Sequence, residues 1–566
     1  MMDFKKEIAD RVSALTEGVS GAELMEMMEI PKYSDMGDIS LPCFKMAKQF
    51  RKAPKAIAEE LAGALQQDAL FDKVDAVNGY LNFHLKKSLF AGAVIGEVLA
   101  AKDSYGSSDL GAGKNVIVEF SSPNIAKPFH MGHIRSTVIG NSLYRIYKAL
   151  GYNTTAINHL GDYGTQFGKL IVAYKLWGDK ATIEADPIPE LLKIYVKFHE
   201  EAEKNPELDE EARGWFTRLE GNDPEATELW EWIRAVSLKE FNRVYALLDA
   251  HFDSLAGESF YSDKMPAVLA EMREKGVMTD SQGAEIVDLE PHGLPPALIT
   301  KKDGSTLYIT RDLAAATYRK AHYDFYKNIY VVGAAQKLHF QQWKKILELM
   351  GHAWSLDCEH VEFGMVSLEE GSLSTRKGRV VFLEEVLKKA IEKTREIIEE
   401  KSPHLENKDD IARQVGVGAV IYQELSNNRI KDYTFSWERT LSFEGESGPY
   451  VQYTHARACS VLRKATLDFS GEVDYSLLDS KEAMDLIRIM SQFPQVIQDA
   501  ARKYEPALIT RLITDLAQAF NRFYHDHAIL VEDQAVSKAR LALVNAVRQT
   551  LRNGLTLITM AAPEKM

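Results

Sequence analysis

The stretch VIVEFSSPNIAKPFHMGHIRSTVIG, residues 116–140, decides the fold of this 566-residue chain. It begins with a short apolar run that suits a buried parallel strand. A polar loop follows, and apolar residues then recur at helical spacing as far as Leu150, where Gly151 ends the pattern. Residues 153–160, NTTAINHL, have the character of a second strand. Strand, helix and strand at this length predict a parallel βαβ unit.

Two histidines, His130 and His133, flank Gly132 where the first strand passes into the helix. Unpaired backbone N–H groups and the positive end of the helix dipole favour anions at such a junction. Gly132 lets backbone or nucleotide approach closely, and both imidazoles can donate hydrogen bonds to phosphate. The pattern predicts a phosphate site. It also occurs in nucleotidylyltransferases and can flank a helix start by chance, so it does not choose the reaction by itself.

The rest of the chain is too long for one hydrophobic core, which stops growing at roughly 250–300 residues, so several domains are expected. We expect a Rossmann-like α/β core with a parallel sheet, a small α/β N-terminal domain and an all-α C-terminal bundle. Further strands are predicted over 306–310 and 328–335, and a helix from Leu383 to about Lys401. The predicted divisions are 1–110, 111–370 with an acidic helical insertion at about 180–290, 371–430, and 431–566.

The composition, with 45% hydrophobic and 27% charged residues, fits a soluble globular protein. Its three cysteines are widely spaced and predict buried thiols in a reducing, cytoplasmic compartment. A net charge of −14 argues mildly against nucleic-acid binding, but net charge does not locate a basic face. No self-association segment stands out, so a monomer is expected, and no membrane partner.

Five ordered blocks of the sequence resemble the arginyl-tRNA synthetases of class I, a family of aminoacyl-tRNA synthetases. The first block contains the family's HIGH motif and the last its KMSKS loop region. The blocks span residues 119–140, 158–170, 306–319, 331–343 and 363–387. The resemblance implies an arginine–tRNA ligase, which forms arginyl-adenylate from ATP, releases pyrophosphate and transfers arginine to the terminal adenosine of tRNA(Arg).

The resemblance also implies how ATP is bound. Pyrophosphate would be neutralised by Arg376 or Lys377, or by Lys127 if the loop does not reach it, because residues 372–378 depart from Lys-Met-Ser-Lys-Ser. Mg²⁺ would arrive with ATP, since it prefers phosphate and water oxygens, so no protein metal site is expected. The predicted ATP contacts are His130, Gly132, His133, Phe363, Met365, Val366 and Ser374.

An arginine pocket must present acceptors in a fork to the five guanidinium donors. Tyr308 and Asp312 lie one helical turn apart and can face one pocket, with Asp312 as the guanidinium partner. Asp312 could instead be a helix-start acid that pairs with Arg311 or Arg319. A carboxylate at Glu119 in an apolar strand is costly unless it is paired. The family resemblance implies that Glu119 and Asn124 hold the amino and carboxylate ends of the substrate. The full set of predicted arginine contacts is Glu119, Ser121, Asn124, His130, Tyr308, Asp312 and Gln336.

The C-terminal region resembles the family's anticodon-binding domain, and the first 110 residues its tRNA-elbow domain. Exposed rings and guanidinium planes suit the splayed bases of single-stranded loops. Most aromatics of the C-terminal region, such as Phe520 and Phe523, also fit a helical core. The predicted tRNA contacts are Tyr80, Asn82, Tyr450, Tyr453, Arg457, Asn521 and Tyr524.

Two other functions fit parts of the sequence. A nucleotidylyltransferase with the same His-x-Gly-His motif predicts a shorter chain without a helical RNA-binding domain. A non-catalytic RNA-binding relative predicts loss of His130, His133 or the basic loop, and the sequence retains all of them.

Overall fold

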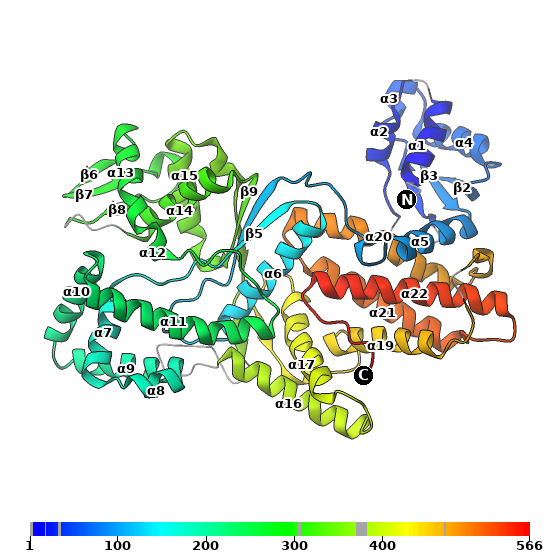
Figure 1. Cartoon of the computed structure of the whole chain (residues 1–566). Helices are drawn as coiled ribbons and strands as arrows, with labels where there is room; N and C mark the ends of the chain where they lie inside the picture. Colours follow the sequence, from blue (N-terminus) through cyan, green and yellow to red (C-terminus); the bar gives the residue numbers. More distant parts are fainter. Residues whose placement is uncertain (1–3, 17, 32–35, 303–306, 369–381, 469–470) are drawn as a thin grey trace.

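A computed structural model describes residues 4–16, 18–31, 36–302, 307–368, 382–468 and 471–566. Figure 1 shows a parallel sheet at the centre of the molecule, an insertion of helices and small strands on one side of it, and a long helical domain on the other. The N-terminal domain sits against the far part of the helical domain. Every helix among the described residues is too short or too polar to cross a membrane.

The central sheet has four parallel strands in the order β10-β9-β4-β5. The chain leaves β4 towards β5 on one side and later returns to β9 on the other. The carboxyl ends of β4 and β9 therefore form a topological switch point, where open α/β sheets bind their ligands. The strands are β4 (Asn115–Glu119), β5 (Asn153–Ile157), β9 (Lys327–Gly333) and β10 (Cys358–Phe363).

Helix α6 (Ile134–Ala149) joins β4 to β5 and packs closely on the sheet. A Cβ atom at Gly140 would lie 2.1 Å from the Cβ of Phe120, so the helix can approach the strand end only with glycine there. Gly151, with φ +78°, follows the helix. The predicted βαβ unit is confirmed.

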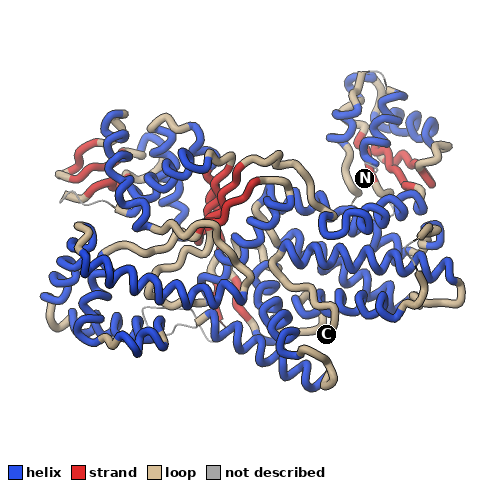
Figure 2. Tube along the Cα trace, viewed as in Figure 1, coloured by secondary structure: helices blue, strands red, loops and turns tan. Residues whose placement is uncertain are grey.

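The insertion between β5 and β9 has two parts (Figure 2). The first is helical: α7 (Thr165–Trp177), α8 (Lys180–Ala185), α9 (Pro187–Ala202), α10 (Glu207–Glu220) and α11 (Pro224–Leu247). The second contains an antiparallel sheet in the order β6-β7-β8 beside three helices. Its elements are α12 (Glu258–Tyr261), α13 (Met265–Glu274), β6 (Thr279–Ser281), β7 (Ala284–Val287), β8 (Ala297–Thr300) and α14 (Tyr308–Tyr323).

The predicted strand over residues 306–310 is wrong, because α14 begins at Tyr308. Ile309 and Thr310 are both buried, and Thr310 donates from its hydroxyl to the carbonyl of Ile299, 3.1 Å away. Tertiary packing outweighs the β propensity of this short apolar run. The predicted strand at 328–335 is confirmed as β9, and α15 (Lys337–Leu349) follows it.

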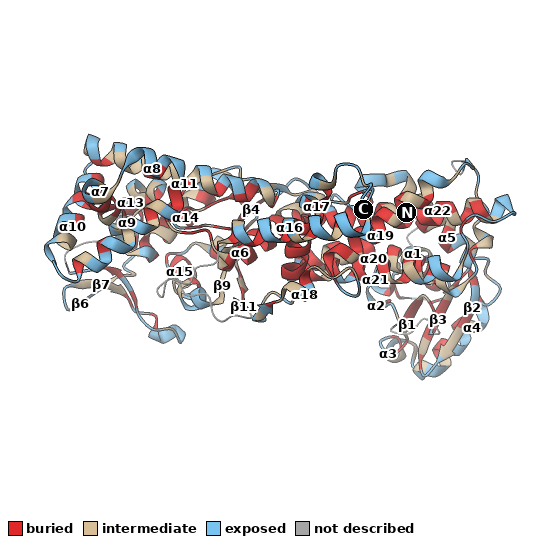
Figure 3. Cartoon of the chain, turned by 90° about the horizontal axis from the view of Figure 1, so that it is seen from below, coloured by how far each residue is buried: buried red, intermediate tan, exposed pale blue. Residues whose placement is uncertain are grey.

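From Leu383 onwards, the described part of the chain is helical apart from one short strand. Strand β11 (Val366–Leu368) pairs in parallel with β12 (Tyr433–Phe435), which the expectation of helix alone after residue 410 missed. Figure 3 shows the continuous buried face of the helices, to which Phe493, Phe520 and Phe523 contribute. The helices are α16 (Leu383–Lys401), α17 (Lys408–Leu425), α18 (Trp437–Thr440), α19 (Gly448–Lys464), α20 (Lys481–Lys503), α21 (Ala507–Asp526) and α22 (Gln534–Leu557).

The N-terminal domain contains a three-stranded antiparallel sheet on which two helices, α2 and α4, pack, and α1 packs on α2. Asn78 and Gly79 both have positive φ, 52° and 85°, so the predicted hairpin turn between β2 and β3 is confirmed. Helix α5 (Lys87–Ala101) then packs on α20 and α22. The other elements are α1 (Phe4–Leu15), α2 (Gly21–Met27), β1 (Ile39–Pro42), α3 (Ala47–Phe50), α4 (Pro54–Leu65), β2 (Phe71–Val77) and β3 (Tyr80–Leu85).

Candidate active site

The His-x-Gly-His segment forms a tight turn at the start of α6, at the carboxyl end of β4. The backbone N–H of Gly132 donates to Nδ1 of His130 over 3.0 Å, and the backbone N–H of His130 donates to Nδ1 of His133 over 3.2 Å. The two rings lie 4.0 Å apart. A Cβ atom at Gly132 would lie 2.8 Å from the ring of His130, so the turn requires glycine.

These contacts fix the tautomers of both histidines. Burial lowers the pKa of His130, and burial together with the neighbouring His130 lowers the pKa of His133 to about 3. Both rings are therefore neutral near pH 7. Since Nδ1 of each ring accepts a backbone hydrogen bond, the ring proton lies on Nε2. The turn thus offers two Nε2–H donors that carry no charge.

The loop between β4 and this turn is held by buried hydroxyl groups. The hydroxyl of Ser121 lies 2.9 Å from that of Tyr245 on α11, and Thr137 donates to it over 3.0 Å. Ser121, Ser122 and Ala126 all have positive φ, a conformation that non-glycine residues hold only when their surroundings enforce it. The insertion helix α11 is therefore part of the scaffold of the loop.

A buried ion pair occupies the end of β4. Glu119 accepts from Nη1 of Arg319 over 2.5 Å, and the Arg319 side chain is fully buried. Nε of Arg319 lies 3.3 Å from the hydroxyl of Tyr261, and its Nη2 lies 3.3 Å from Nδ1 of His159. The carboxylate in the apolar strand is thus paired, as the cost of burying it requires.

Two further carboxylates lie beside this pair. Asp312 lies two turns before Arg319 on α14 and contacts Nε2 of His339 at 2.5 Å. Glu258 pairs with Arg311 at 3.1 Å, and burial raises the pKa of Glu258 to about 7, with the charge of Asp312 adding to the shift. Because α15 begins just after β9, this contact places Asp312 near the carboxyl end of β9, next to that of β4.

The structure brings most of the predicted arginine contacts to this edge of the sheet. Asp312 pairs with neither Arg311 nor Arg319, the two partners considered for a purely structural acid. Asn124 is exposed and bridges to Gly161 after β5. Gln336 is exposed in the turn between β9 and α15, and Tyr308 is 66% exposed. The hydroxyl of Ser121 already contacts the hydroxyls of Tyr245 and Thr137, so Ser121 is the least available to the substrate among the predicted arginine contacts.

The segment after β10 is linked to the start of α6 by Arg135, whose Nη1 donates to the carbonyl of Gly364 over 3.0 Å. Phe363 and Val366 are buried, whereas Met365 is 65% exposed. Lys127 is half-buried, and burial lowers its pKa. Beyond the loop, Leu383 donates its backbone N–H to the carbonyl of Phe129 over 2.9 Å. The predicted contacts Ser374, Arg376 and Lys377 lie outside the described residues.

The five predicted tRNA contacts of the C-terminal domain form one cluster across α19 and α21. Asn521 donates to the hydroxyl of Tyr450 over 2.9 Å and accepts from Arg457. The Arg457 guanidinium lies 4.9 Å from the ring centre of Tyr453 and 5.4 Å from that of Tyr524. Both of these rings are about two-fifths exposed. The cluster thus combines internal polar contacts with two rings that can still stack on a base.

In the N-terminal domain, Tyr80 begins β3 and meets the exposed ring of Phe44 edge to face, with ring centres 5.2 Å apart. Asn82 is buried, and its amide oxygen accepts from the hydroxyl of Ser40 over 2.6 Å. Tyr80 is therefore the more accessible of the two predicted elbow contacts.

Known proteins match the chain over its whole length. Residues 94–437 match the catalytic-domain model of class I tRNA synthetases for arginine (R), a range of more than half of the chain. The chain belongs to the arginyl-tRNA synthetases. Residues 2–85 match the N-terminal domain of arginyl-tRNA synthetases and residues 451–566 the DALR anticodon-binding domain. The predicted family, fold class and enzyme class, an arginine–tRNA ligase, are confirmed.

Individual relatives agree with this family. Arginine–tRNA ligases from Halothermothrix orenii and Clostridioides difficile are each 61% identical to the chain, with both chains fully covered. The arginyl-tRNA synthetase of Thermus thermophilus superposes with a TM-score of 0.83 at 26% identity, again with both chains fully covered. The matched anticodon-binding domain argues against the nucleotidylyltransferase alternative, which predicted no such domain.

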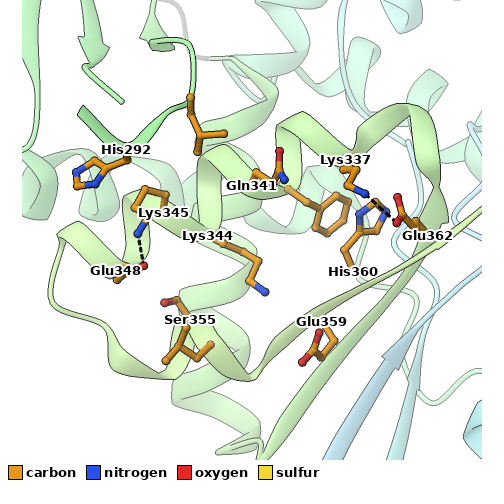
Figure 4. Close-up of a pocket in the computed structure, with 13 residues that line it drawn as sticks. His292, Lys337, Gln341, Lys344, Lys345, Glu348, Ser355, Glu359, His360 and Glu362 are labelled. Carbon is orange, nitrogen blue, oxygen red and sulfur yellow. Dashed lines mark hydrogen bonds and ion pairs between the residues drawn. The ribbon is translucent and has the colours of Figure 1, made fainter. Parts of the chain in front are cut away.

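A separate cleft of 460 Å³ lies on the outer face of α15 and β10 (Figure 4). Its charges are largely paired, Lys337 with Glu362 at 3.0 Å and Lys345 with Glu348 at 2.7 Å. None of the predicted catalytic or binding residues lines it. The described residues also contain no group of three or more His, Cys, Asp or Glu side chains placed to hold a metal ion.

Proposed function

We propose that this synthetase forms arginyl-adenylate at the edge of the sheet where β4 and β9 end. The observation that carries the proposal is the pairing of two kinds of group at one switch point. Neutral Nε2–H donors lie after β4, and carboxylates lie on β4 (Glu119) and on α14 (Asp312), where Asp312 contacts His339 just after β9. The donors suit a triphosphate, and the carboxylates suit a guanidinium.

At the phosphate end, His130 and His133 stabilise charge. A carboxylate oxygen of arginine attacks the α-phosphorus of ATP in line. A bond forms between this oxygen and the phosphorus, and the bond between the α-phosphorus and the oxygen of the leaving pyrophosphate breaks. No protein nucleophile is needed, so catalysis consists of positioning and charge stabilisation. The two Nε2–H groups donate to phosphate oxygens as negative charge moves to the leaving group. Both rings take part as neutral hydrogen-bond donors.

Positive charge for the pyrophosphate comes from other groups. Lys127 lies three residues before His130 and is half-buried, so its charge acts where water screens it less. Arg376 and Lys377 are proposed to share this task from the KMSKS-like loop. Mg²⁺ is proposed to enter with ATP, held by phosphate and water oxygens, and to neutralise part of the charge of the triphosphate.

At the arginine end, Asp312 is the proposed partner of the guanidinium. The guanidinium would replace His339 on the Asp312 carboxylate, and Tyr308 and Gln336 would complete the pocket. Asn124 and Glu119 would hold the amino and carboxylate ends of the substrate. Glu119 keeps Arg319 as a buried partner, which orients its carboxylate towards the site.

The second step transfers arginine from the adenylate to the terminal adenosine of tRNA, at the 2′-hydroxyl in a class I enzyme. The tRNA would be held at a distance from this chemistry by Tyr450, Tyr453, Arg457, Asn521 and Tyr524, with Tyr80 and Asn82 at its elbow. The exposed rings of Tyr453 and Tyr524 support the anticodon contact. We propose that the enzyme acts as a cytoplasmic monomer.

The proposal is tested by pyrophosphate exchange into ATP, measured with each of the twenty amino acids, with and without tRNA(Arg). We expect exchange with arginine alone, and dependence on tRNA. Exchange with another amino acid, or none in the presence of tRNA(Arg), would overturn the proposal.

A further inference from the structure

A buried arginine lies directly behind the phosphate-binding turn. Arg135 is fully buried and lies two residues after His133, in the first turn of α6. Its Nη1 donates to the carbonyl of Gly364 over 3.0 Å and to that of Lys431 over 2.8 Å, and its Nη2 donates to the carbonyl of Asn428 over 3.4 Å. One guanidinium therefore holds backbone from two segments that lie more than sixty residues apart in sequence.

The two segments also form hydrogen bonds with each other. The first is the turn 363–366, where β10 passes into β11, and the second is the connection 428–432 before β12. Gly364 donates its N–H to the carbonyl of Arg429 over 2.8 Å, and Met365 donates to Oδ1 of Asp432 over 2.6 Å. A Cβ atom at Gly364 would lie 2.6 Å from the same Asp432 oxygen. The turn and the connection thus form one packed unit against Arg135.

Acidic and aromatic groups complete the environment of Arg135. Its Nε lies 3.5 Å from Oε2 of the buried Glu424, and its guanidinium lies 5.2 Å from the ring centre of Tyr433. The hydroxyl of Tyr433 donates to the other Glu424 oxygen. A buried ion pair of this kind is weak evidence for stability, because desolvation of both charges offsets their attraction. Its geometry therefore points to a role in placement.

We propose that Arg135 is a positioning residue for the activation of ATP. The inference rests on the proposed function, in which the two histidines contact phosphate, and on the family resemblance, which implies that the adenine of ATP lies beside the turn 363–366. His133 and Arg135 belong to the same helix start, and Arg135 binds the turn directly. The guanidinium therefore sets the distance between the adenine-binding backbone and the phosphate donors, and so lets one nucleotide reach both.

Only a planar fork makes these contacts together. Lysine would keep the positive charge next to Glu424, but its single ammonium group cannot reproduce two guanidinium nitrogens that face three separate carbonyls. Arg135→Lys should therefore loosen the turn 363–366 without leaving a buried carboxylate unpaired. The lysine variant therefore distinguishes misplacement of the turn 363–366 from loss of the positive charge beside Glu424.

The test compares Arg135→Lys with Arg145→Lys, a control three turns further along the same helix. Arg145 bonds to Asp249 and to the carbonyl of Thr556, away from the turn. In pyrophosphate exchange with tRNA(Arg), Arg135→Lys should raise KM for ATP about 10-fold through lost charged hydrogen bonds and leave KM for arginine within about twofold. Arg145→Lys should leave both values within about twofold.

A second variant decides the matter if Arg135→Lys fails to fold. Tyr433→Phe removes only the hydroxyl that bonds Glu424 and keeps the ring beside Arg135. It should raise KM for ATP about threefold, again without changing KM for arginine. Calorimetric binding of a non-hydrolysable ATP analogue should show the same loss of affinity in each folded variant.

The outcomes separate this inference from the proposed function. Equal increases in both KM values, or a lower melting temperature with unchanged KM for ATP, would make Arg135 a structural residue and overturn the inference. In that case the wild-type enzyme would still exchange pyrophosphate with arginine. Loss of arginine-dependent exchange in the wild type would instead remove the proposed function.

Discussion

The two ends of the active site differ in how their polar groups are occupied. At the phosphate end, the backbone binds Nδ1 of His130 and of His133 and leaves their Nε2–H groups for the ligand. At the arginine end, each carboxylate already has an internal partner: Glu119 pairs with Arg319, Glu258 pairs with Arg311, and Asp312 contacts Nε2 of His339. Under the proposed function, the phosphate end is preorganised, whereas the arginine end exchanges an internal partner for the substrate.

This difference suggests where specificity arises. A substrate that binds Asp312 displaces His339 and has to compensate for the lost contact. A guanidinium can do so, because it is permanently charged and donates two parallel hydrogen bonds to a carboxylate. A neutral side chain would leave the carboxylate or the histidine without a partner, which costs affinity. Under the proposed function, the internal pairs therefore favour a guanidinium over a neutral side chain. The following predictions test the contrast, from the largest effect to the smallest.

At the phosphate end, His130→Ala should lower kcat for pyrophosphate exchange about 10²–10³-fold, the effect of removing one preorganised donor to developing charge. KM for arginine should change little. The matched control is His525→Ala, because His525 lies near the exposed end of α21, far from the sheet. A fall in kcat below tenfold would contradict the assigned role of His130.

At the arginine end, Asp312→Asn should raise KM for arginine by about 30- to 100-fold, the value of a charged hydrogen bond. KM for ATP should stay within about threefold. Asp324→Asn on the same helix is the control, since Asp324 is largely exposed at the helix end. Equal changes in both KM values would make Asp312 a structural residue.

The pH dependence of arginine binding should reveal Glu258. Burial raises the pKa of Glu258 to about 7, so the carboxyl is mostly neutral at pH 6 and ionised at pH 8. Ionisation adds negative charge beside Asp312, and the affinity for the cationic substrate should therefore rise several-fold across this range. Calorimetric titration with arginine measures it. Glu258→Gln should remove this rise; an unchanged rise in the variant would assign it to another group.

The smallest effect is expected at His339. His339→Ala removes the partner that arginine would displace from Asp312, so KM for arginine should fall by about two- to fivefold, the effect of losing one competing side-chain hydrogen bond. The steady-state rate at low arginine concentration measures it. An increase in KM would show that His339 supports the pocket and does not compete for it.

The sequence predicts the phosphate end more completely than the arginine end. The βαβ unit and its histidines are local features, and a strand, a glycine and a helix start within 35 residues define them. The partners of the carboxylates are distant in sequence: Arg319 lies 200 residues from Glu119, and Arg311 lies 53 from Glu258. A buried acid in an apolar strand required some cation, but periodicity could not choose which.

The secondary structure that the prediction missed has a similar cause. Strands β6 and β7 are three and four residues long, and β6 is fully exposed, so neither carries a clear alternation of apolar and polar residues. The run at 306–310 has apolar and β-branched residues typical of a strand, yet its described part is the start of α14, where Thr310 is buried against Ile299. In both regions, tertiary contacts determine the secondary structure.

The most direct test of the account is a crystal structure with arginine and a non-hydrolysable ATP analogue bound together. We predict that the guanidinium binds Asp312 in place of His339, and that Nε2 of His130 and His133 lies within about 3 Å of phosphate oxygens. A structure in which Asp312 keeps His339 while the guanidinium binds elsewhere would contradict the account.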